Sequence, residues 1–351
     1  MNNRVLWVDN AKAIGMVLVF AGHFMEQIAS AGIDVALEPY KYIYSFHIPF
    51  FFFISGFFIK IPEGESFKEY LKKKALVRLV PVLFFEAILI PVWLYKFNFN
   101  LLDFLWFGKS NIIGHPTYNG VNWFVVCLFT AELYIYFIYK YFIKYKLLIG
   151  SLVLLLGVYI CNHTNKLDLV NNPWYIYEGI VAAGFCILGN FAFPYLQNMY
   201  ERIDFKSRFL VFLLAGLMAW YSAIHNTRVV GMILSEHGIP EYFLLAAFFG
   251  IIAFIFLATL VPVNRVLTFV GENSLAFLGL NGAFVEFINI PLAQSIQPSE
   301  NFWYIMFISI VGTVTSMVVC YPFIILFNKW VPQLVGKKRF NKTRTENLVA
   351  Q

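Results

Sequence analysis

The sequence predicts an all-α, polytopic membrane protein, a transmembrane helical bundle of about ten spans. Of its 351 residues, 60% are hydrophobic and only 13% are charged, whereas charged residues make up about a quarter of a soluble domain. Apolar runs long enough to cross a bilayer recur along the whole chain. The expected spans are 11–31, 41–60, 76–95, 121–142, 146–162, 174–193, 208–226, 241–261, 266–290 and 302–328.

The basic residues divide unequally between the two sides of this bundle. With the N-terminus inside, the inner side receives most of them: Arg4, Lys68, Lys72, Lys73, Lys74, Lys140, Lys144, Lys146, Arg202, Lys206, Arg208, Arg265, Lys329, Lys337, Lys338, Arg339, Lys342 and Arg344. The outer side keeps Lys41, Lys96, Lys109, Lys166 and Arg228. The positive-inside rule therefore predicts that both termini are cytoplasmic. Anionic lipid explains the basic tail more simply than nucleic acid, so no nucleic-acid partner is expected.

The chain is expected to form one membrane domain over residues 1–335, followed by a basic cytoplasmic tail over 336–351. Charged residues interrupt the first apolar segment too often for a cleavable signal peptide. The cysteines lie in or at the ends of apolar spans and show no ligand spacing: Cys127, Cys161, Cys186 and Cys320. We therefore expect buried cysteines, with neither a metal site nor a disulfide framework.

The first span carries ionisable residues where a membrane helix normally has none. Lys12 and His23 are eleven residues apart, which places them on one face of a helix and about 16 Å apart along its axis. Glu26 follows His23 by one turn. Because ionisable groups are costly at membrane depth, they usually face a cavity or other protein. This helix is therefore the first candidate for a functional site.

The next two expected spans also carry ionisable residues. His47 is followed at i+2 by Pro49, which removes a backbone donor and disturbs the helix. The small pair Ser55-Gly56 allows another helix to approach closely. Lys74 and Arg78 form an i, i+4 pair on one face of the third span, at the same depth as Lys12.

These segments resemble the acyltransferase-3 family of bacterial integral-membrane O-acyltransferases. The similarity lies in four motifs: Trp7-Val8-Asp9-Asn10-Ala11-Lys12 with ten residues between the lysine and His23, Phe46 to Gly56, Arg78-Leu79-Val80-Pro81, and Asn122-Trp123-Phe124. The chain departs from the family pattern at two places. The family has its basic pair three residues apart, but Ala75 occupies that position and Lys74 precedes it. A late family histidine is replaced by Asn281.

The resemblance implies transfer of an acyl group, expected to be acetyl, from cytosolic acyl-CoA to a hydroxyl of a cell-surface polysaccharide or its undecaprenyl-linked precursor, such as capsule or O-antigen. It places the protein in the bacterial cytoplasmic (inner) membrane. It implies acetyl-CoA, or another acyl-CoA, as co-substrate, and no bound cofactor is expected. Three sets of residues are the candidate site: His23 and Glu26 for catalysis, Lys12, Lys74 and Arg78 for acyl-CoA, and His47, Asn122 and Trp123 for the acceptor.

Two other functions remain open from the sequence. Intramembrane Lys, His and Glu also suit a transporter or flippase of a lipid-linked glycan or small anion. A sensor or partner subunit could keep the fold without catalysis. The sequence does not choose a role among Glu86, Glu132, Glu178 and Glu286. The remaining histidines are expected on solvated loops: His115, His163, His225 and His237.

Overall fold

The computed structural model describes residues 5–97, 101–164, 172–296 and 299–337. Within these ranges the regular structure is helical, apart from an isolated bridge between Gly231 and Glu236. The helices are α1 Leu6–Ser30, α2 Leu37–Gly56, α3 Phe67–Phe97, α4 Leu101–Ile112, α5 Trp123–Phe142, α6 Lys146–His163, α7 Ile176–Arg202, α8 Phe205–His225, α9 Pro240–Leu260, α10 Arg265–Glu272, α11 Ser274–Phe284, α12 Ile290–Ser295 and α13 Phe302–Trp330. The predicted all-α class is confirmed.

Among the described residues, eight helical segments are long and apolar enough to cross a membrane: 6–30, 120–142, 146–163, 173–200, 205–225, 240–260, 274–295 and 302–330. The other two expected spans, 41–60 and 76–95, coincide with α2 and α3. The chain is a multi-pass membrane protein. Most of the expected basic tail, residues 338–351, lies outside the described residues.

The structure differs from the expected spans at two places. Helix α4 was not predicted. The span expected at 266–290 is broken at Asn273, between α10 and α11, and continues through a π-helical segment, Val285–Asn289, into α12. Asn273 Nδ2 donates to the carbonyl oxygen of Phe269 at 2.7 Å, and Oδ1 accepts from Asn328 Nδ2 at 2.8 Å. The break therefore depends on tertiary contacts that the apolar pattern does not encode.

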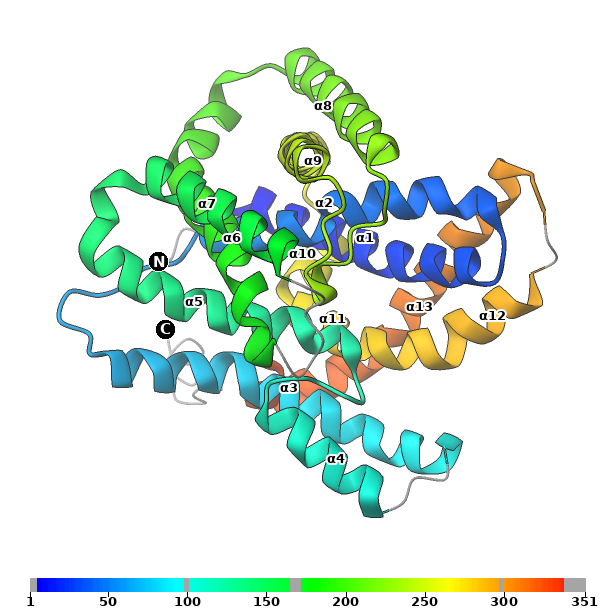
Figure 1. Ribbon diagram of the computed structural model, residues 1–351. Helices are drawn as coiled ribbons and strands as arrows, with labels where there is room; N and C mark the ends of the chain where they lie inside the picture. Colours follow the sequence, from blue (N-terminus) through cyan, green and yellow to red (C-terminus); the bar gives the residue numbers. More distant parts are fainter. Residues whose placement is uncertain (1–4, 98–100, 165–171, 297–298, 338–351) are drawn as a thin grey trace, which may run out of the picture.

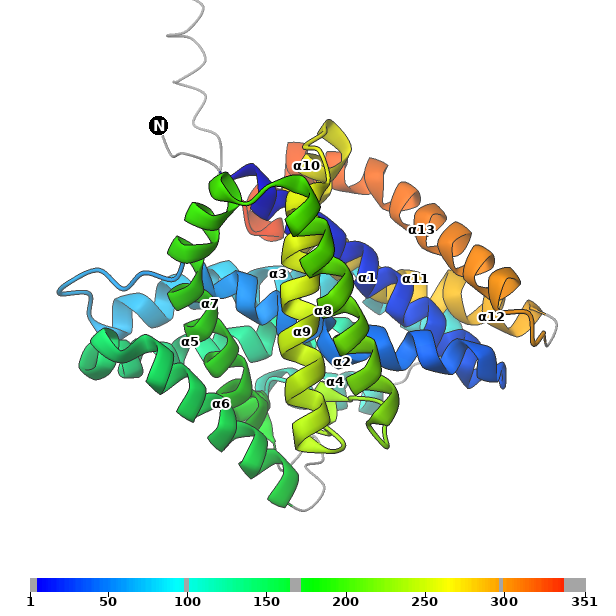
Figure 2. The same ribbon diagram turned by 90° about the horizontal axis from the view of Figure 1, so that it is seen from above.

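Helix α1 is the central element of the bundle. It contacts α2, α9, α10, α11 and α13. Figure 1 shows α1 and α2 side by side through the middle of the molecule, with α3 and α4 on one side and α8 and α9 on the other. Seen from above, α6 pairs with α7 and α8 with α9, while α13 lies beyond α1 (Figure 2). This arrangement surrounds the polar stripe of α1 with other helices.

Two glycines allow α2 and α7 to touch backbone to backbone. A Cβ on Gly56 would lie only 1.9 Å from the carbonyl oxygen of Cys186, and one on Gly189 would lie 1.9 Å from that of Phe53. Any side chain at either position would force the helices apart. The close approach expected at Ser55-Gly56 is confirmed for Gly56. This contact fixes the position of the C-terminal half of α2 against α7.

Candidate functional site

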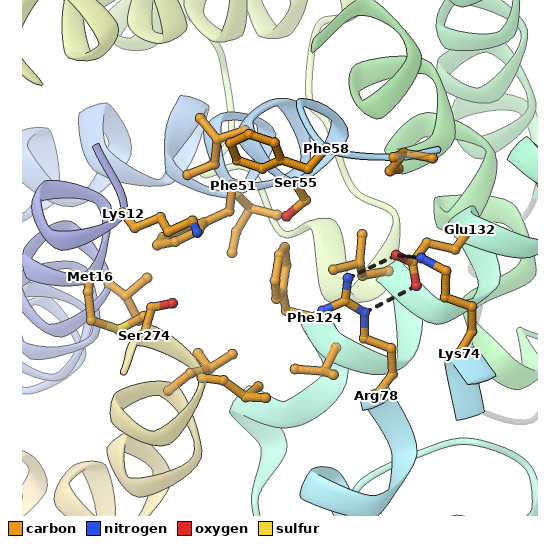
Figure 3. Close-up of a pocket in the computed structure, with 18 residues that line it drawn as sticks. Lys12, Met16, Phe51, Ser55, Phe58, Lys74, Arg78, Phe124, Glu132 and Ser274 are labelled. Atoms are coloured by element: carbon orange, nitrogen blue, oxygen red, sulfur yellow. Dashed lines mark hydrogen bonds and ion pairs between the residues drawn. The ribbon is translucent and has the colours of Figure 1, made fainter. Parts of the chain in front are cut away.

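A cavity of about 280 Å³ brings the predicted acyl-CoA residues together. We call it the Lys12 cavity. Lys12 enters it from α1, opposite Lys74 and Arg78 of α3, with Phe124 of α5 between them (Figure 3). The only charged residues among its described lining are these three cations and Glu132, so the lining carries a net charge of +2 (three minus one). Such a cavity favours an anionic ligand.

Glu132 of α5 organises the two cations of α3. Arg78 donates to its carboxylate through Nε and Nη2 at 3.1 and 2.8 Å, and Lys74 donates through Nζ at 2.6 Å. The Glu132 side chain is 1% exposed, while those of Lys74 and Arg78 are 16% and 24% exposed. The carboxylate thus neutralises one charge and holds both cations at the cavity wall. The i, i+4 spacing serves this purpose because both side chains leave the same face of α3.

A second cavity, of about 410 Å³, contains the other predicted residues except Asn122. We call it the His23 cavity. His23 and Glu26 of α1 line it together with His47 of α2 and Trp123 of α5. Tyr44, Trp93 and Tyr118 add aromatic surface, and Glu286 from the π-helical segment adds a carboxylate. Its mixture of aromatic rings and polar groups contrasts with the cationic Lys12 cavity.

His23 and Glu26 form a hydrogen-bonded dyad. His23 Nδ1 lies 3.1 Å from Glu26 Oε2, and the Tyr44 hydroxyl donates to the same carboxylate oxygen at 2.7 Å. Tyr40 donates to Glu26 Oε1 at 3.3 Å. A neutral imidazole in this position carries its hydrogen on Nδ1, where the carboxylate accepts it, and keeps the Nε2 lone pair. Among the described residues, Nε2 has no hydrogen-bond partner, so it is available as a base.

The remaining residues predicted to bind the acceptor occupy different positions. His47 is buried, and its Nδ1 donates to the carbonyl oxygen of Ile43 at 2.8 Å, which directs Nε2 away from the helix backbone. Trp123 is at the cavity wall. Asn122 is not part of the described lining; its Nδ2 donates to Glu86 at 3.2 Å. Glu86 also accepts the backbone N–H groups of residues 117–119. Asn122 and Glu86 therefore hold the loop that carries part of the cavity wall.

The two cavities meet at Ile48, the residue that both described linings share. The same helices run past both. On α1, Met16 and Val19 line the Lys12 cavity before His23 lines the other, and on α11, Leu278 lines the first and Gly282 the second. The two cavities therefore follow one another along α1, from the cations toward the dyad.

A third cavity, of about 980 Å³, adjoins the Lys12 cavity and shares Lys12, Phe58 and Ile59 with it. It adds Lys60 and Lys146 to the positive charge at this end, opposed by Asp9. Lys146 Nζ donates to Asn190 Oδ1 at 2.7 Å. A polar ligand could therefore reach the Lys12 cavity through this wider cavity.

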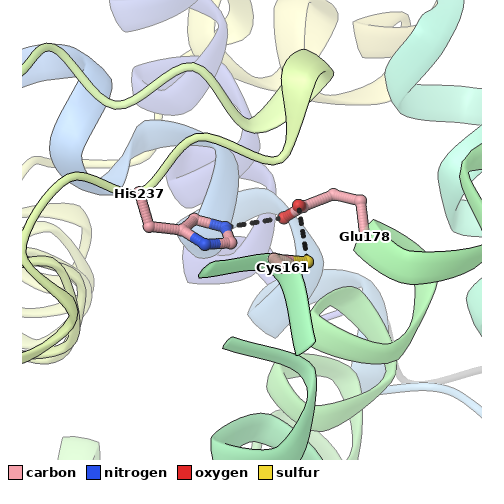
Figure 4. A group of neighbouring side chains, drawn as sticks. All are labelled: Cys161, Glu178 and His237. Atoms are coloured by element: carbon pink, nitrogen blue, oxygen red, sulfur yellow. Dashed lines mark hydrogen bonds and ion pairs between the residues drawn. The ribbon is translucent and has the colours of Figure 1, made fainter. Parts of the chain in front are cut away.

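A separate cluster lies near loop 226–239. His237 Nε2 and Cys161 Sγ approach the carboxylate of Glu178 at 3.2 and 3.7 Å, and all three residues are buried (Figure 4). Sequence spacing gave no sign of these neighbours, although they are residue types that bind metals. The hydrogen bonds to Glu178 account for their proximity and fix the loop.

Two of the histidines expected on solvated loops are buried instead. His237 is 0% exposed because it bonds Glu178 and stacks on Phe243, with ring centroids 4.4 Å apart. His115 is 2% exposed and packs edge-on against Tyr175. The expectation was therefore wrong for these two, because their loops fold back into the protein. His163 and His225 are exposed, as expected.

The comparison with known families identifies the chain. Residues 5–322 match the model of the acyltransferase family, described as "Acyltransferase domain". The chain belongs to this family. Because the match covers the helices that build both cavities, these cavities are the candidate active site of a membrane acyltransferase.

Two relatives of this acyltransferase are nodulation proteins NolL. That of Mesorhizobium japonicum is 37% identical over 101 residues, covering 27% of this chain and 26% of the relative. That of Sinorhizobium fredii is 35% identical over 94 residues, 25% of each chain. The matched regions thus span about a quarter of these relatives. No solved structure matches the acyltransferase.

Two residues of this acyltransferase that contact the predicted site residues, Glu132 and Tyr44, were not predicted from the sequence. Glu132 was one of four acidic residues in apolar runs without an assigned role, and only the packing of α5 on α3 selects it. Tyr44 lies one helical turn before the next candidate, His47. That spacing on α2 was an available signal that it shares a face with the predicted site.

Proposed function

We propose that this acyltransferase moves an acyl group, expected to be acetyl, from cytosolic acyl-CoA to a hydroxyl of a surface polysaccharide or its undecaprenyl-linked precursor. One observation carries the proposal. A cationic cavity and a cavity with a histidine–carboxylate dyad meet end to end along α1, at Ile48. This is the arrangement that a transfer between an anionic donor and an uncharged hydroxyl acceptor requires.

The Lys12 cavity suits the donor. Its net positive charge favours the phosphates of CoA, and the Arg78 guanidinium is held where it can form paired hydrogen bonds to phosphate oxygens. The adjoining third cavity supplies space for the nucleotide, with Lys60 and Lys146 near it. The extended pantetheine arm is comparable in length to the roughly 16 Å from Lys12 to His23. Anchored phosphates thus leave the thioester near the dyad.

The His23 cavity suits the acyl-transfer step. His23 Nε2 removes the proton from the acceptor hydroxyl as its oxygen attacks the thioester carbonyl. The tetrahedral intermediate then loses the CoA thiolate, which takes the proton from His23. Glu26 stabilises the imidazolium and holds the ring in position. The products are the acyl ester and free CoA.

The walls of the His23 cavity suit a sugar acceptor. Aromatic rings stack on the apolar faces of sugar rings, and Trp123, Trp93, Tyr44 and Tyr118 all line this cavity. His47 and Glu286 add polar groups for hydroxyls. With both termini in the cytoplasm, as the basic residues predict, the Lys12 cavity faces the acyl-CoA pool of the cell. The His23 cavity then lies toward the outer half of the cytoplasmic membrane, where surface glycans are assembled.

The test is CoA release from acetyl-CoA by the purified protein, with and without crude surface glycan. Glycan-dependent release is expected for the wild type and is expected to fall about 10²–10⁴-fold in His23→Ala, which removes the general base. His163→Ala, an exposed histidine outside both cavities, is the matched control. Release that His23→Ala leaves unchanged would overturn the assigned role of the dyad. No release with any acyl-CoA would favour transport of a glycan or anion.

A further inference from the structure

The buried cluster of Cys161, Glu178 and His237 joins three separate parts of the chain. Cys161 is on α6, Glu178 is in the first turn of α7, and His237 is in loop 226–239. Their exposed fractions are 5%, 0% and 0%. Cys161 and His237 lie 17 and 59 positions from Glu178 in the chain. Spacing in the sequence therefore could not indicate a metal site that is assembled only by the fold.

The donor atoms of this cluster have nearly the spacing of a tetrahedral zinc site. His237 Nε2 lies 3.2 Å from Glu178 Oε1, and Cys161 Sγ lies 3.7 Å from Glu178 Oε2. The three residues offer donor atoms that all lie within 4.8 Å of one another. Zinc bonds of 2.0–2.3 Å at tetrahedral angles place such atoms roughly 3.3–3.6 Å apart. The side chains converge on one point (Figure 4), so small movements bring all three within bonding distance of one ion.

The chemistry of the three donors favours zinc. Thiolate and imidazole are ligands of zinc, whereas calcium and magnesium take oxygen ligands. One zinc ion balances the charges of a thiolate and a carboxylate, which matters for groups buried this deeply. Binding releases the proton of the Cys161 thiol. In the metal-free protein, the hydrogen bonds to Glu178 hold the same groups together.

A cavity of about 520 Å³ gives access to the cluster. Cys161 and His237 both line it, and loop 226–239 supplies most of the described lining. Its other charged lining residues, Arg228 and Glu236, carry opposite charges. An ion can therefore reach the donors from this cavity, and a water molecule in it can serve as the fourth ligand.

Loop 226–239 connects the cluster with the His23 cavity. Residues 230–233 line the His23 cavity. Gly231 and Glu236 exchange two backbone hydrogen bonds, at 2.8 and 3.1 Å. His237 follows this pair directly, and its carbonyl oxygen accepts from Asn226 Nδ2 at 2.8 Å. An ion bound by His237 would therefore fix the segment that forms part of the wall of the His23 cavity.

We propose that Cys161, Glu178 and His237 bind a structural zinc ion, with a water molecule as the fourth ligand. The ion anchors loop 226–239 to α6 and α7. It takes no part in acyl transfer and acts by holding the loop in place.

The test is zinc binding by the full-length protein, purified without a histidine tag and treated with EDTA. The wild type should bind one zinc ion per chain, measured by elemental analysis after dialysis. Cobalt(II) in place of zinc should give the strong near-ultraviolet absorption of a cobalt–thiolate bond. Cys161→Ser should lose this absorption. Glu178→Gln should bind zinc more than about 100-fold more weakly, since losing only a hydrogen bond to a metal ligand already costs about 10–100-fold.

Two control variants and a local measurement accompany this test. Cys320→Ser, at a buried cysteine of α13, and His163→Ala, at an exposed histidine of α6, should bind zinc as the wild type does. Zinc should raise the thermal unfolding temperature of the wild type and slow hydrogen exchange of the Gly231 and Glu236 amides. Neither change is expected in Cys161→Ser.

Three outcomes would overturn the zinc site. The first is a folded wild type that binds no zinc. The second is equal zinc binding by the wild type, Cys161→Ser and Glu178→Gln, which would indicate an adventitious ion only. The third is zinc binding without the cobalt–thiolate absorption, which would exclude Cys161 as a ligand. These measurements use neither acyl-CoA nor glycan, so their result is independent of the proposed function.

Discussion

The Lys12 and His23 cavities are built in different ways. In the His23 cavity, the central hydrogen bonds join residues no more than 21 positions apart, within the α1–α2 hairpin. In the Lys12 cavity, Glu132 holds Arg78 and Lys74 across 54 and 58 positions, between α5 and α3. The first arrangement depends on one hairpin, whereas the second depends on how distant helices pack. We therefore expect substitutions in the two cavities to differ in their effects on stability and catalysis.

Removing Glu132 is expected to give the largest effect on stability. Glu132→Leu leaves Lys74 and Arg78 without their carboxylate, and breaking a buried ion pair from one side costs about 3–5 kcal/mol. Thermal unfolding in detergent measures the loss. Glu241→Gln, an exposed acidic residue at the start of α9, is the control and is expected to have little effect.

A triple variant tests whether the loss of stability comes from the unpaired cations. Replacing all three charged groups with apolar ones, in Lys74→Met/Arg78→Met/Glu132→Leu, removes the uncompensated charge and is expected to recover most of the stability. Binding of CoA should not recover, because two of the three cations of the Lys12 cavity are gone. CoA binding equal to wild type would show that this cavity does not hold the donor.

Removing the charge of Glu26 is expected to affect catalysis and leave stability nearly unchanged. Glu26→Gln keeps the shape of the side chain but no longer stabilises a protonated His23, so kcat should fall on the order of 10²-fold. The KM for acyl-CoA should not change, because the donor cavity is intact. Tyr40→Phe, which loses a single hydrogen bond to the same carboxylate, serves as the mild comparison. An increase in the KM for acyl-CoA would contradict the division of roles between the cavities.

Gly56→Ala tests a contact that supports both cavities. An added Cβ would meet the Cys186 carbonyl oxygen at 1.9 Å, so α2 and α7 must separate, and such overpacking costs about 1–3 kcal/mol. Gly216→Ala on α8 is the matched control, because its Cβ has only the Tyr42 hydroxyl nearby, at 3.9 Å. Urea or thermal unfolding of the two variants gives the comparison. Equal stability would mean that α2 and α7 are not tightly packed.

The sequence predicts what lies within one helix or one hairpin. The eleven-residue separation places Lys12 and His23 on one face of α1, and the motifs on α2 and α3 supply His47 and Arg78. Residues that depend on tertiary packing could not be predicted. Glu132 was indistinguishable from Glu86, Glu178 and Glu286, because each lies in an apolar run and only the partner helix decides its role.

The same limit explains the errors in the predicted burial and helix boundaries. His115 and His237 lie in loops, and loop position alone does not show that a loop folds back between helices. The break at Asn273 depends on Asn328, 55 residues away. Asn281 could be noticed as a departure from the family pattern, but only the structure shows that its buried amide has no hydrogen-bond partner among the described residues.

The smallest effect is expected at Ile48, where the two cavities meet. Ile48→Ala shortens the side chain between the thioester and the His23 cavity, so water reaches the thioester more easily and glycan-independent hydrolysis of acyl-CoA should rise several-fold. Glycan-dependent transfer should fall only slightly, because the cations and the dyad remain. Leu83→Ala, at an exposed position on α3, controls for the loss of apolar surface. Unchanged hydrolysis would show that Ile48 does not separate water from the donor, and that the two cavities are divided by other side chains.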